Sequence, residues 1–365
     1  MRNDLILQQR VRRLREKLKR ESYDAIFISN FYNIFYLTGF KTLTTDEREA
    51  FVLVTSSNVY LFTDARYLSA PQSSFELRLI EPHHGVLQHL EEIIKKEKIE
   101  KLGFEGEDLK YFEYQRLTMT AKNTSLHPLP HLLVKEREIK DASEIKKIER
   151  ACDVTGQCLN DMVKIIREGI TEKEIAFKTE LWLKSNGYDL AFYPIVAVDS
   201  NSAIPHYDTR SGNGIVAKSS LILIDFGAKF EDYLSDITRV FFVGEPTKEQ
   251  RFAYQTLLAA QEKTVELISK NKDPKTIDTA CRNMITEANL PDYSHSTGHG
   301  VGLEIHEYPK ISFNSQDSVL EQQVFTIEPG IYLPGKFGLR IEDTVAIEKG
   351  QAKILTKFPK TMQIF

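Results

Sequence analysis

The sequence predicts an α+β protein of two domains, and three observations carry that prediction. The chain has 365 residues, which is about two domains on the usual size range. Segments with strand character alternate with amphipathic helical segments along its length. The stretch HPLPHLL, residues 127–133, contains two prolines that deny the backbone regular hydrogen bonds. We therefore expect an N-terminal domain at 1–127, a linker at 128–140 and a C-terminal domain at 141–365.

The N-terminal segment has the pattern of a compact α/β domain. Val11, Leu14 and Leu18 recur at helical spacing and predict an amphipathic helix. Further helices are expected at 86–96 and 111–121. Apolar runs rich in β-branched and aromatic residues predict strands at AIFIS (25–29), AFVLVT (50–55), VYLFTD (59–64), FELRLI (75–80) and KLGFEG (101–106).

Capping patterns predict three long helices in the C-terminal domain. Each pattern places an N-cap side chain three residues before Glu or Gln: Asp141 with Glu144, Thr171 with Glu174, and Thr247 with Gln250. Strands are predicted at PIVAV (194–198), LILIDFG (221–227), ITRVFFV (237–243), VFTIEPG (324–330) and LRIEDTVAI (339–347). This order indicates an antiparallel or mixed sheet with helices packed on one side.

Composition excludes several classes of protein. Lys and Arg number 48 against 52 Asp and Glu, a net charge of −4, so no nucleic-acid partner is expected. The N-terminal residues carry charges every few positions without an apolar core, which fits neither a signal peptide nor a membrane span. The three cysteines form no CxxC pair. We expect a cytoplasmic protein with no membrane partner.

Two acidic residues interrupt core-like sequence in LILIDFGAKFEDYLSDITRVFFV. Asp225 ends one apolar run, and Asp236 precedes the next, 236 − 225 = 11 residues later. A hairpin would bring both carboxylates together, and buried carboxylates repel each other unless they are protonated or matched by a cation. The alternative is a pair of polar turn residues that flank two strands.

The same feature recurs near the C-terminus. Glu328 follows an apolar strand, and Glu342 lies inside another. Arg340 lies two residues before Glu342, on the same face of a strand, so a buried ion pair is the alternative there. His299 lies between Gly298 and Gly300, which allow backbone to approach closely around its ring.

Taken together, four carboxylates and one imidazole form a candidate site for two divalent ions. The charge of +4 on two divalent ions balances the charge of −4 on four carboxylates, which suits a buried site. Oxygen ligands with one nitrogen favour Mn²⁺, with Co²⁺, Fe²⁺ or Zn²⁺ as alternatives. Two such ions can share and ionise a water near neutral pH, which implies hydrolysis.

With these residues in that order, the chain resembles the pita-bread dinuclear metallopeptidases, which include methionine aminopeptidases, Xaa-Pro aminopeptidases and prolidases. The flanking motifs NSAIPH, HSTGHGVGLEIHE and EPG carry the resemblance, as do NIFYLTGF and TDARYL in the N-terminal domain. It implies a C-terminal pita-bread (creatinase/aminopeptidase) domain and a smaller creatinase-like α/β N-terminal domain. The metal ligands it implies are Asp225, Asp236, His299, Glu328 and Glu342.

The resemblance also implies roles for other residues. Xaa-Pro peptidases add a histidine four positions before the metal-binding one and an arginine two before the last Glu, which here are His295 and Arg340. His206 and His306 would approach the substrate, His306 as a donor to the developing oxyanion. Glu328 would also move the proton.

A pocket for the proline ring is expected because a prolyl nitrogen has no N–H to grip. The aromatic candidates are Phe192, Tyr193 and Tyr308. Lys310 is a candidate partner for the carboxylate of a dipeptide. The resemblance further implies short proline-containing peptides as substrates and a homodimer.

Four functions follow from these patterns. The main prediction is a metal-dependent Xaa-Pro aminopeptidase, and an Xaa-Pro dipeptidase (prolidase) stays open beside it. A catalytically silent binding protein with the same fold is an alternative that the intact ligand set opposes. A methionine aminopeptidase is disfavoured by the extra domain and by His295.

Overall fold

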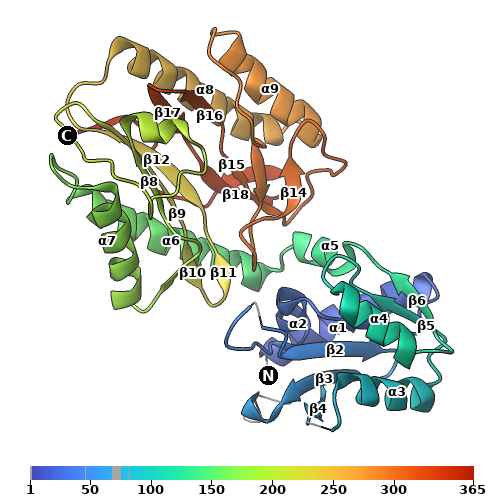
Figure 1. Ribbon diagram of the computed structural model, residues 1–365. Coiled ribbons are helices and arrows are strands. Elements are labelled where there is room, and N and C mark those ends of the chain that lie inside the picture. The colour runs from blue at the N-terminus through green and yellow to red at the C-terminus, as the bar shows by residue number, and fades with distance from the viewer. Residues whose placement is uncertain (1, 46, 68–74, 82) are drawn as a thin grey trace. The chain divides into compact units, whose positions relative to one another are not determined.

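The chain divides into two compact units in the computed structural model, Met1–Arg137 and Glu138–Phe365. The structure describes residues 2–45, 47–67, 75–81 and 83–365 (Figure 1). Leu68, at the end of the TDARYL motif, lies outside the described residues. None of the described helices is both long enough and apolar enough to span a bilayer.

The first unit is built on a six-stranded sheet with the order β4-β3-β2-β1-β5-β6. The predicted strands are confirmed as β1 (Ala25–Ile28), β2 (Ala50–Thr55), β3 (Val59–Asp64), β4 (Glu76–Ile80) and β5 (Lys101–Phe104). The predicted helices are confirmed as α1 (Arg2–Arg20), α3 (Val86–Glu97) and α4 (Tyr111–Thr120). Residues of both sheet and helices, among them Phe27, Leu53, Phe62 and Leu90, form its core.

Three elements in this part of the chain were not predicted as such. The NIFYLTGF motif lies largely in helix α2 (Phe31–Thr38), which Asn30 caps and Gly39 ends in the left-handed conformation. Residues 125–128 form the edge strand β6 (Ser125–Pro128), and α5 (Leu132–Glu138) follows inside the segment assigned to a linker. Pro128 is tolerated because it ends an edge strand, where its missing N–H removes no bond from an interior ladder.

In the second unit, the three predicted capping boxes are confirmed. Asp141, Thr171 and Thr247 accept hydrogen bonds at the starts of α6 (Ala142–Val163), α7 (Glu172–Ser185) and α8 (Lys248–Ile268). The sequence interpretation missed α9 (Pro274–Thr286), although Asp273 is an N-cap followed by proline at the first turn.

Two larger sheets carry the second unit. One has the order β20-β12-β9-β8 and the other β14-β13-β15-β18-β19. The first consists of β8 (Ile195–Val198), β9 (Leu221–Phe226), β12 (Ile237–Phe242) and β20 (Gln363–Ile364). The second consists of β13 (Gly298–Gly300), β14 (Glu307–Ile311), β15 (Val324–Ile327), β18 (Asp343–Glu348) and β19 (Gln351–Ile354). Short hairpin strands complete the unit: β7 (Asp189–Leu190), β10 (Ala228–Phe230), β11 (Tyr233–Leu234), β16 (Gly330–Leu333) and β17 (Phe337–Arg340).

The helices form two pairs, α6 with α7 and α8 with α9 (Figure 1). Ile224 and Phe226 of β9 pack with residues of α6 and α7, whereas Leu221 and Leu223 pack with residues of α8. The expectation of helices on one side of the sheet is therefore wrong for this strand, because both of its faces are buried. Asp225 alternates with Ile224 and Phe226 and faces away from α6 and α7.

LRIEDTVAI was predicted as one strand and is two. Its first two residues, Leu339 and Arg340, end β17, and the part from Asp343 onward lies in β18. β17 pairs with β16, whereas β18 pairs with β15. Glu342 therefore lies at the break between two sheets rather than inside a strand.

Candidate metal centre

Three of the predicted ligands come within reach of one ion. Asp236, His299 and Glu342 each offer a ligand atom, and these atoms lie within 4.8 Å of one another. All three residues are buried. Asp236 directly precedes β12, His299 lies in β13, and Glu342 lies in the break before β18, so three separate chain segments converge.

The other two acids border this group. Glu328 follows β15, and its Oε1 lies 3.4 Å from His299 Nε2. Asp225 pairs with Thr238 across β9 and β12, which turns both side chains to the same face. Asp225 lies inside β9, and Asp236 directly precedes β12; both are buried. The alternative of two polar turn residues that flank the strands therefore does not describe Asp225.

Arg340 pairs with a different acid from the one its spacing indicated. Its Nη2 lies 2.5 Å from Oδ2 of Asp225. The alternative of an Arg340–Glu342 pair assumed one continuous strand. The break after β17 lets Oε2 of Glu342 accept a hydrogen bond from Thr238 at 2.6 Å instead.

Burial shapes the charge of this cluster. It raises the pKa of Asp236 and Glu342 well above the ordinary range, and neighbouring carboxylates add to the effect. Burial also raises the pKa of Glu328 to about 8. For His299 burial lowers the pKa to about 3, so its ring is neutral and keeps a lone pair.

A divalent cation fits the unsatisfied atoms. Oδ1 of Asp225 and Oδ1 of Asp236 are buried without a hydrogen-bond partner, and an ionised carboxylate oxygen can only accept. Leaving such atoms unpaired is costly. Cations bound between the carboxylates would pair these oxygens and remove the repulsion, so the residues present fit the ions.

Glycines allow the approach of backbone around His299, as the sequence predicted. A Cβ on Gly298 would lie 1.9 Å from the carbonyl oxygen of Thr326, and one on Gly300 would lie 2.1 Å from that of Tyr308. Side chains at these positions would force β13 away from its neighbours.

Comparison with known proteins agrees with this geometry. Residues 146–349 match Metallopeptidase family M24, and residues 10–139 match the Creatinase/Prolidase N-terminal domain. The chain belongs to metallopeptidase family M24. The predicted family and α+β fold class are thereby confirmed, as is the predicted hydrolase class.

Proteins similar to this chain align with it over almost its whole length. It is 34% identical over 357 residues to the Xaa-Pro dipeptidase of Pyrococcus horikoshii, covering 96% of this chain and 98% of that one. The X-Pro aminopeptidase structure from Thermotoga maritima is 32% identical with a TM-score of 0.86, covering 96% and 100%. The Xaa-Pro dipeptidase structure from Bacillus anthracis is 30% identical with a TM-score of 0.89, covering 98% and 100%.

Two supporting residues of the candidate site, Thr238 and Tyr332, were missed from the sequence. Thr238 receives a hydrogen bond from Nε of Arg340 at 3.0 Å while it donates to Glu342. Tyr332 lies between Arg340 Nη1 at 2.9 Å and His295 Nε2 at 3.0 Å. Thr238 lies two residues after Asp236, and Tyr332 lies four residues after Glu328. This closeness to a candidate ligand in the sequence was the signal that could have identified them.

Charge pairs hold the backbone segments that carry the candidate ligands. Arg239 donates to Asp343 Oδ1 at 2.7 Å and to the carbonyl of Glu342 at 2.5 Å. The buried pair of Lys140 and Glu307 joins Nζ to Oε2 at 2.9 Å. Oε1 of Glu307 accepts from two backbone amides of the loop that carries His306.

The three other predicted histidines lie near the cluster. Nδ1 of His295 lies 4.0 Å from Oε2 of Glu328. His306 is exposed, and its ring centroid lies 4.5 Å from that of His299. His206 is also exposed and follows Pro205, whose carbonyl accepts from Arg340 at 3.2 Å.

The residues predicted to contact substrate differ in their exposure and in their neighbours. Lys310 is exposed and lies opposite His299 across β13 and β14. Tyr308 and Phe192 are half-buried. Tyr193 packs against the α6 and α7 core, with Arg210 at 4.9 Å over its ring.

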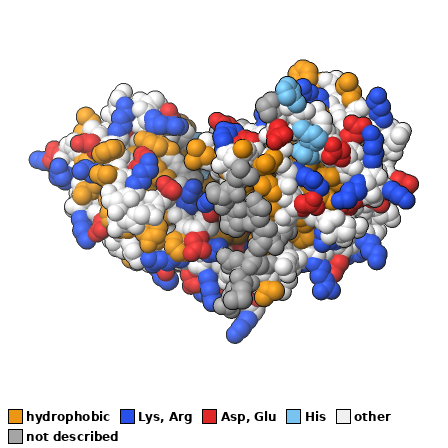
Figure 2. All heavy atoms as spheres, turned by 90° about the horizontal axis from the view of Figure 1, so that it is seen from below, with side chains coloured by type: hydrophobic (Ala, Val, Ile, Leu, Met, Phe, Trp, Pro, Cys, Tyr) orange, Lys and Arg blue, Asp and Glu red, His pale blue; other side chains and the backbone are white. Residues whose placement is uncertain are grey.

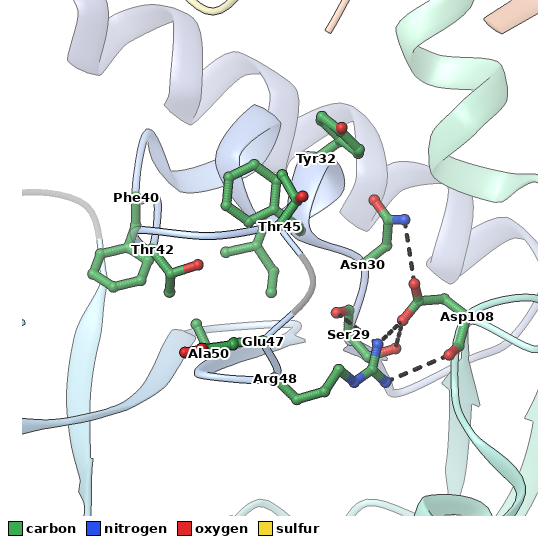
Figure 3. Close-up of a pocket in the computed structure, with 12 residues that line it drawn as sticks. Ser29, Asn30, Tyr32, Phe40, Thr42, Thr45, Glu47, Arg48, Ala50 and Asp108 are labelled. Carbon is green, nitrogen blue, oxygen red and sulfur yellow. Dashed lines mark hydrogen bonds and ion pairs between the residues drawn. The ribbon is translucent and has the colours of Figure 1, made fainter. Parts of the chain in front are cut away.

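A cavity of about 240 Å³ lies in the first unit and is lined by none of these residues. Figure 3 shows Ser29, Asn30 and Arg48 directed to Asp108 in its wall. Arg48 Nη1 lies 2.5 Å from Asp108 Oδ2, so the two charges offset each other. On the face drawn in Figure 2, Lys and Arg side chains are interspersed with Asp and Glu.

Proposed function

We propose that the protein hydrolyses the peptide bond between an N-terminal residue and proline in short peptides. Support comes from family membership and from the names of relatives, both Xaa-Pro dipeptidase and X-Pro aminopeptidase. The main proposal is an aminopeptidase. A dipeptidase has equal support from those names.

Asp225, Asp236, His299, Glu328 and Glu342 would hold two divalent ions. The observation that carries this proposal is the convergence of buried carboxylates with one neutral imidazole and two unpaired carboxylate oxygens. When bound, the ions supply Lewis acidity toward the scissile carbonyl and a water that ionises near neutral pH. Mn²⁺ is the proposed metal because the ligands are mostly oxygen, with Co²⁺, Zn²⁺ or Fe²⁺ as alternatives.

The surrounding side chains have separate tasks in this proposal. Glu328 takes a proton from the nucleophile and delivers it to the leaving prolyl nitrogen, which has none of its own. His306 donates a hydrogen bond to the oxygen on which charge develops. Arg340 and His295, joined through Tyr332, keep Asp225 and Glu328 oriented.

Selectivity would rest on the residues around the leaving group. Phe192, Tyr193 and Tyr308 are proposed to border the proline ring, and His206 to approach the substrate from the opposite side. Lys310 would meet the carboxylate of a dipeptide, because it is exposed and lies across from His299.

A peptide panel before and after chelation tests the function. We expect hydrolysis of Ala-Pro or Ala-Pro-Ala, loss of activity with a chelator, and recovery with Mn²⁺. Metal-loaded protein that cleaves no Xaa-Pro peptide would support the silent binding protein instead. The ratio of the two substrates separates the dipeptidase from the aminopeptidase, and Lys310→Gln should selectively weaken cleavage of Ala-Pro.

We further propose a cytoplasmic homodimer with the domains 1–127 and 141–365 joined by 128–140. The cytoplasmic location is supported by three buried cysteines that are all free thiols. Sedimentation of the purified protein tests the dimer.

A further inference from the structure

A second cluster of potential metal ligands lies in the first unit. The segment HHGVLQHLEE, residues 83–92, holds three of the nine histidines of the chain. His84, His89 and Glu92 each offer a ligand atom, and these atoms lie within 4.8 Å of one another. The proposed peptidase chemistry uses none of them.

Helix geometry explains why these side chains meet. Gly85 is the N-cap of α3, and its amide donates to Gln88 Oε1 at 3.1 Å. His84 thus precedes the cap and His89 is the fourth helical residue, the two positions whose side chains pack across a helix start. Their ring centroids lie 4.1 Å apart. Glu92 is three residues beyond His89 and lies on the same helix face.

The backbone of His84, before the helix, is also held by hydrogen bonds. Glu81 and His84 exchange backbone hydrogen bonds of 3.0 and 3.1 Å. The backbone of His84 is therefore held by Glu81, and His89 and Glu92 lie in a regular helix. Such rigid supports favour a preorganised site.

Hydrogen bonding selects the tautomer of His89. Its Nε2 lies 2.8 Å from the carbonyl oxygen of Leu79 in β4. A carbonyl oxygen can only accept, so Nε2 carries the hydrogen and Nδ1 of the neutral ring keeps its lone pair. Histidines that bind metals are commonly oriented by a carbonyl in this way.

Two nitrogens of the cluster are left without hydrogen bonds. Nδ1 of His89 and Nε2 of His84 are both buried atoms with no hydrogen-bond partner. Nε2 of His84 lies 3.4 Å from Oε1 of Glu92, close enough for attraction but without hydrogen-bond geometry. Unpaired buried nitrogens beside a carboxylate are the arrangement that a cation would satisfy.

We propose that His84, His89 and Glu92 bind a transition-metal ion of the Zn²⁺ class, independently of the catalytic centre. Two imidazoles and one carboxylate suit Zn²⁺, with a fourth position open to solvent. Closing the ligands to about 2.0–2.2 Å from an ion requires side-chain rotation. The side chains of His84 and Glu92 are 37% and 63% exposed, which leaves them room to rotate.

Zinc at this site would connect His84, whose backbone bonds to Glu81, with α3. Its expected effect is stabilisation of the first unit, because the ion binds the folded arrangement and not the unfolded chain. The competing explanation is that the two rings pack across the helix start and attract Glu92 weakly, with no ion.

The test uses the full chain with its catalytic site first loaded with Mn²⁺ and then equilibrated with buffered ZnCl₂. Metal content is compared between the unmodified protein, the His84→Ala/His89→Ala double variant and the control His131→Ala. His131 lies in the same unit with Nε2 3.0 Å from Glu107 Oε1, so the control also removes a histidine paired with an acid.

We expect the unmodified protein and the control to bind one zinc ion more than the double variant. Zinc that exchanges into the catalytic site cancels in this difference. Peptide hydrolysis and circular dichroism of the double variant should match the unmodified protein. Equal zinc content in all three proteins would overturn the proposal.

A milder variant covers the case in which the double variant does not fold. Glu92→Gln changes an exposed side chain and should weaken zinc binding about tenfold or more. Zinc should also slow amide hydrogen exchange in residues 83–92 of the unmodified protein but not of Glu92→Gln at the same zinc concentration. Unchanged zinc affinity in Glu92→Gln would likewise contradict the site.

Discussion

Thr238→Val tests whether the hydroxyl that connects two charged groups of the centre supports metal binding. Thr238 is fully buried in β12. Its Oγ1 donates to Glu342 Oε2 at 2.6 Å and accepts from Arg340 Nε at 3.0 Å. Valine has the same shape and can make neither hydrogen bond.

The expected loss can be estimated from these two contacts. The hydrogen bond from the charged Arg340 contributes about 1.5–3 kcal/mol, and the one to Glu342, whose raised pKa favours the neutral form without metal, contributes about 0.5–1.5 kcal/mol. Burial of the extra methyl group returns about 1 kcal/mol. The free energy of unfolding of the metal-free protein should therefore fall by about 1–3.5 kcal/mol. Metal affinity should fall about 10–100-fold, because Glu342 loses the partner that orients it.

Two assays measure these effects. The single tryptophan, Trp182, lies in α7 and reports urea unfolding of the second unit by fluorescence. Titration of activity with Mn²⁺ gives the metal affinity. Thr264→Val is the matched control, because its buried hydroxyl donates to the carbonyl of Ala260 at 2.7 Å and lies in α8, away from the candidate ligands. Metal affinity as high in Thr238→Val as in the control would refute the reasoning.

Three further perturbations follow from the structure. Lys140→Met should destabilise the second unit by about 3–5 kcal/mol, because it leaves the buried carboxylate of Glu307 without its cation; an unchanged midpoint in tryptophan-monitored urea unfolding would contradict this. Gly298→Ala should abolish metal-dependent activity, because its Cβ would lie 1.9 Å from a carbonyl oxygen. Gly156→Ala is the control and should stay active, because a Cβ there would have nothing within 4 Å. Equal activity of the two variants in peptide assays would argue against the close approach at Gly298. Burial raises the pKa of Glu105 to about 7, so its stabilising protonated form is lost as pH rises from about 4.5 through 7, and the first unit should lose about 3 kcal/mol. Urea unfolding followed by circular dichroism at about pH 5 and pH 8 measures this loss, which should be absent in Glu105→Gln.

Most of the secondary structure could be predicted because its signals are local. Capping boxes at Asp141, Thr171 and Thr247 require only residues three apart, and each forms as predicted. The missed helix α9 carried a local signal too, at Asp273 and Pro274. By contrast, the division of LRIEDTVAI into β17 and β18 has no local signal, because different neighbouring strands pair with each half.

The candidate site shows the same division between local and distant information. Its acids could be selected because each interrupts an apolar run, and the glycines because they flank His299. Their pairing was misjudged where it depended on a straight strand. Thr238 and Tyr332 were missed because a neutral hydroxyl acquires its role only from the groups that surround it after folding.

The sequence by itself determined which side chains are available to bind metal and in what order they occur, because ligand chemistry belongs to residue type. Only the tertiary structure decided that Arg340 contacts Asp225, a residue 115 positions away, and that Glu342 turns to Thr238. The physical reason is that strand register and the break between two sheets depend on packing between segments that are far apart in the sequence. A local sequence pattern does not contain that information.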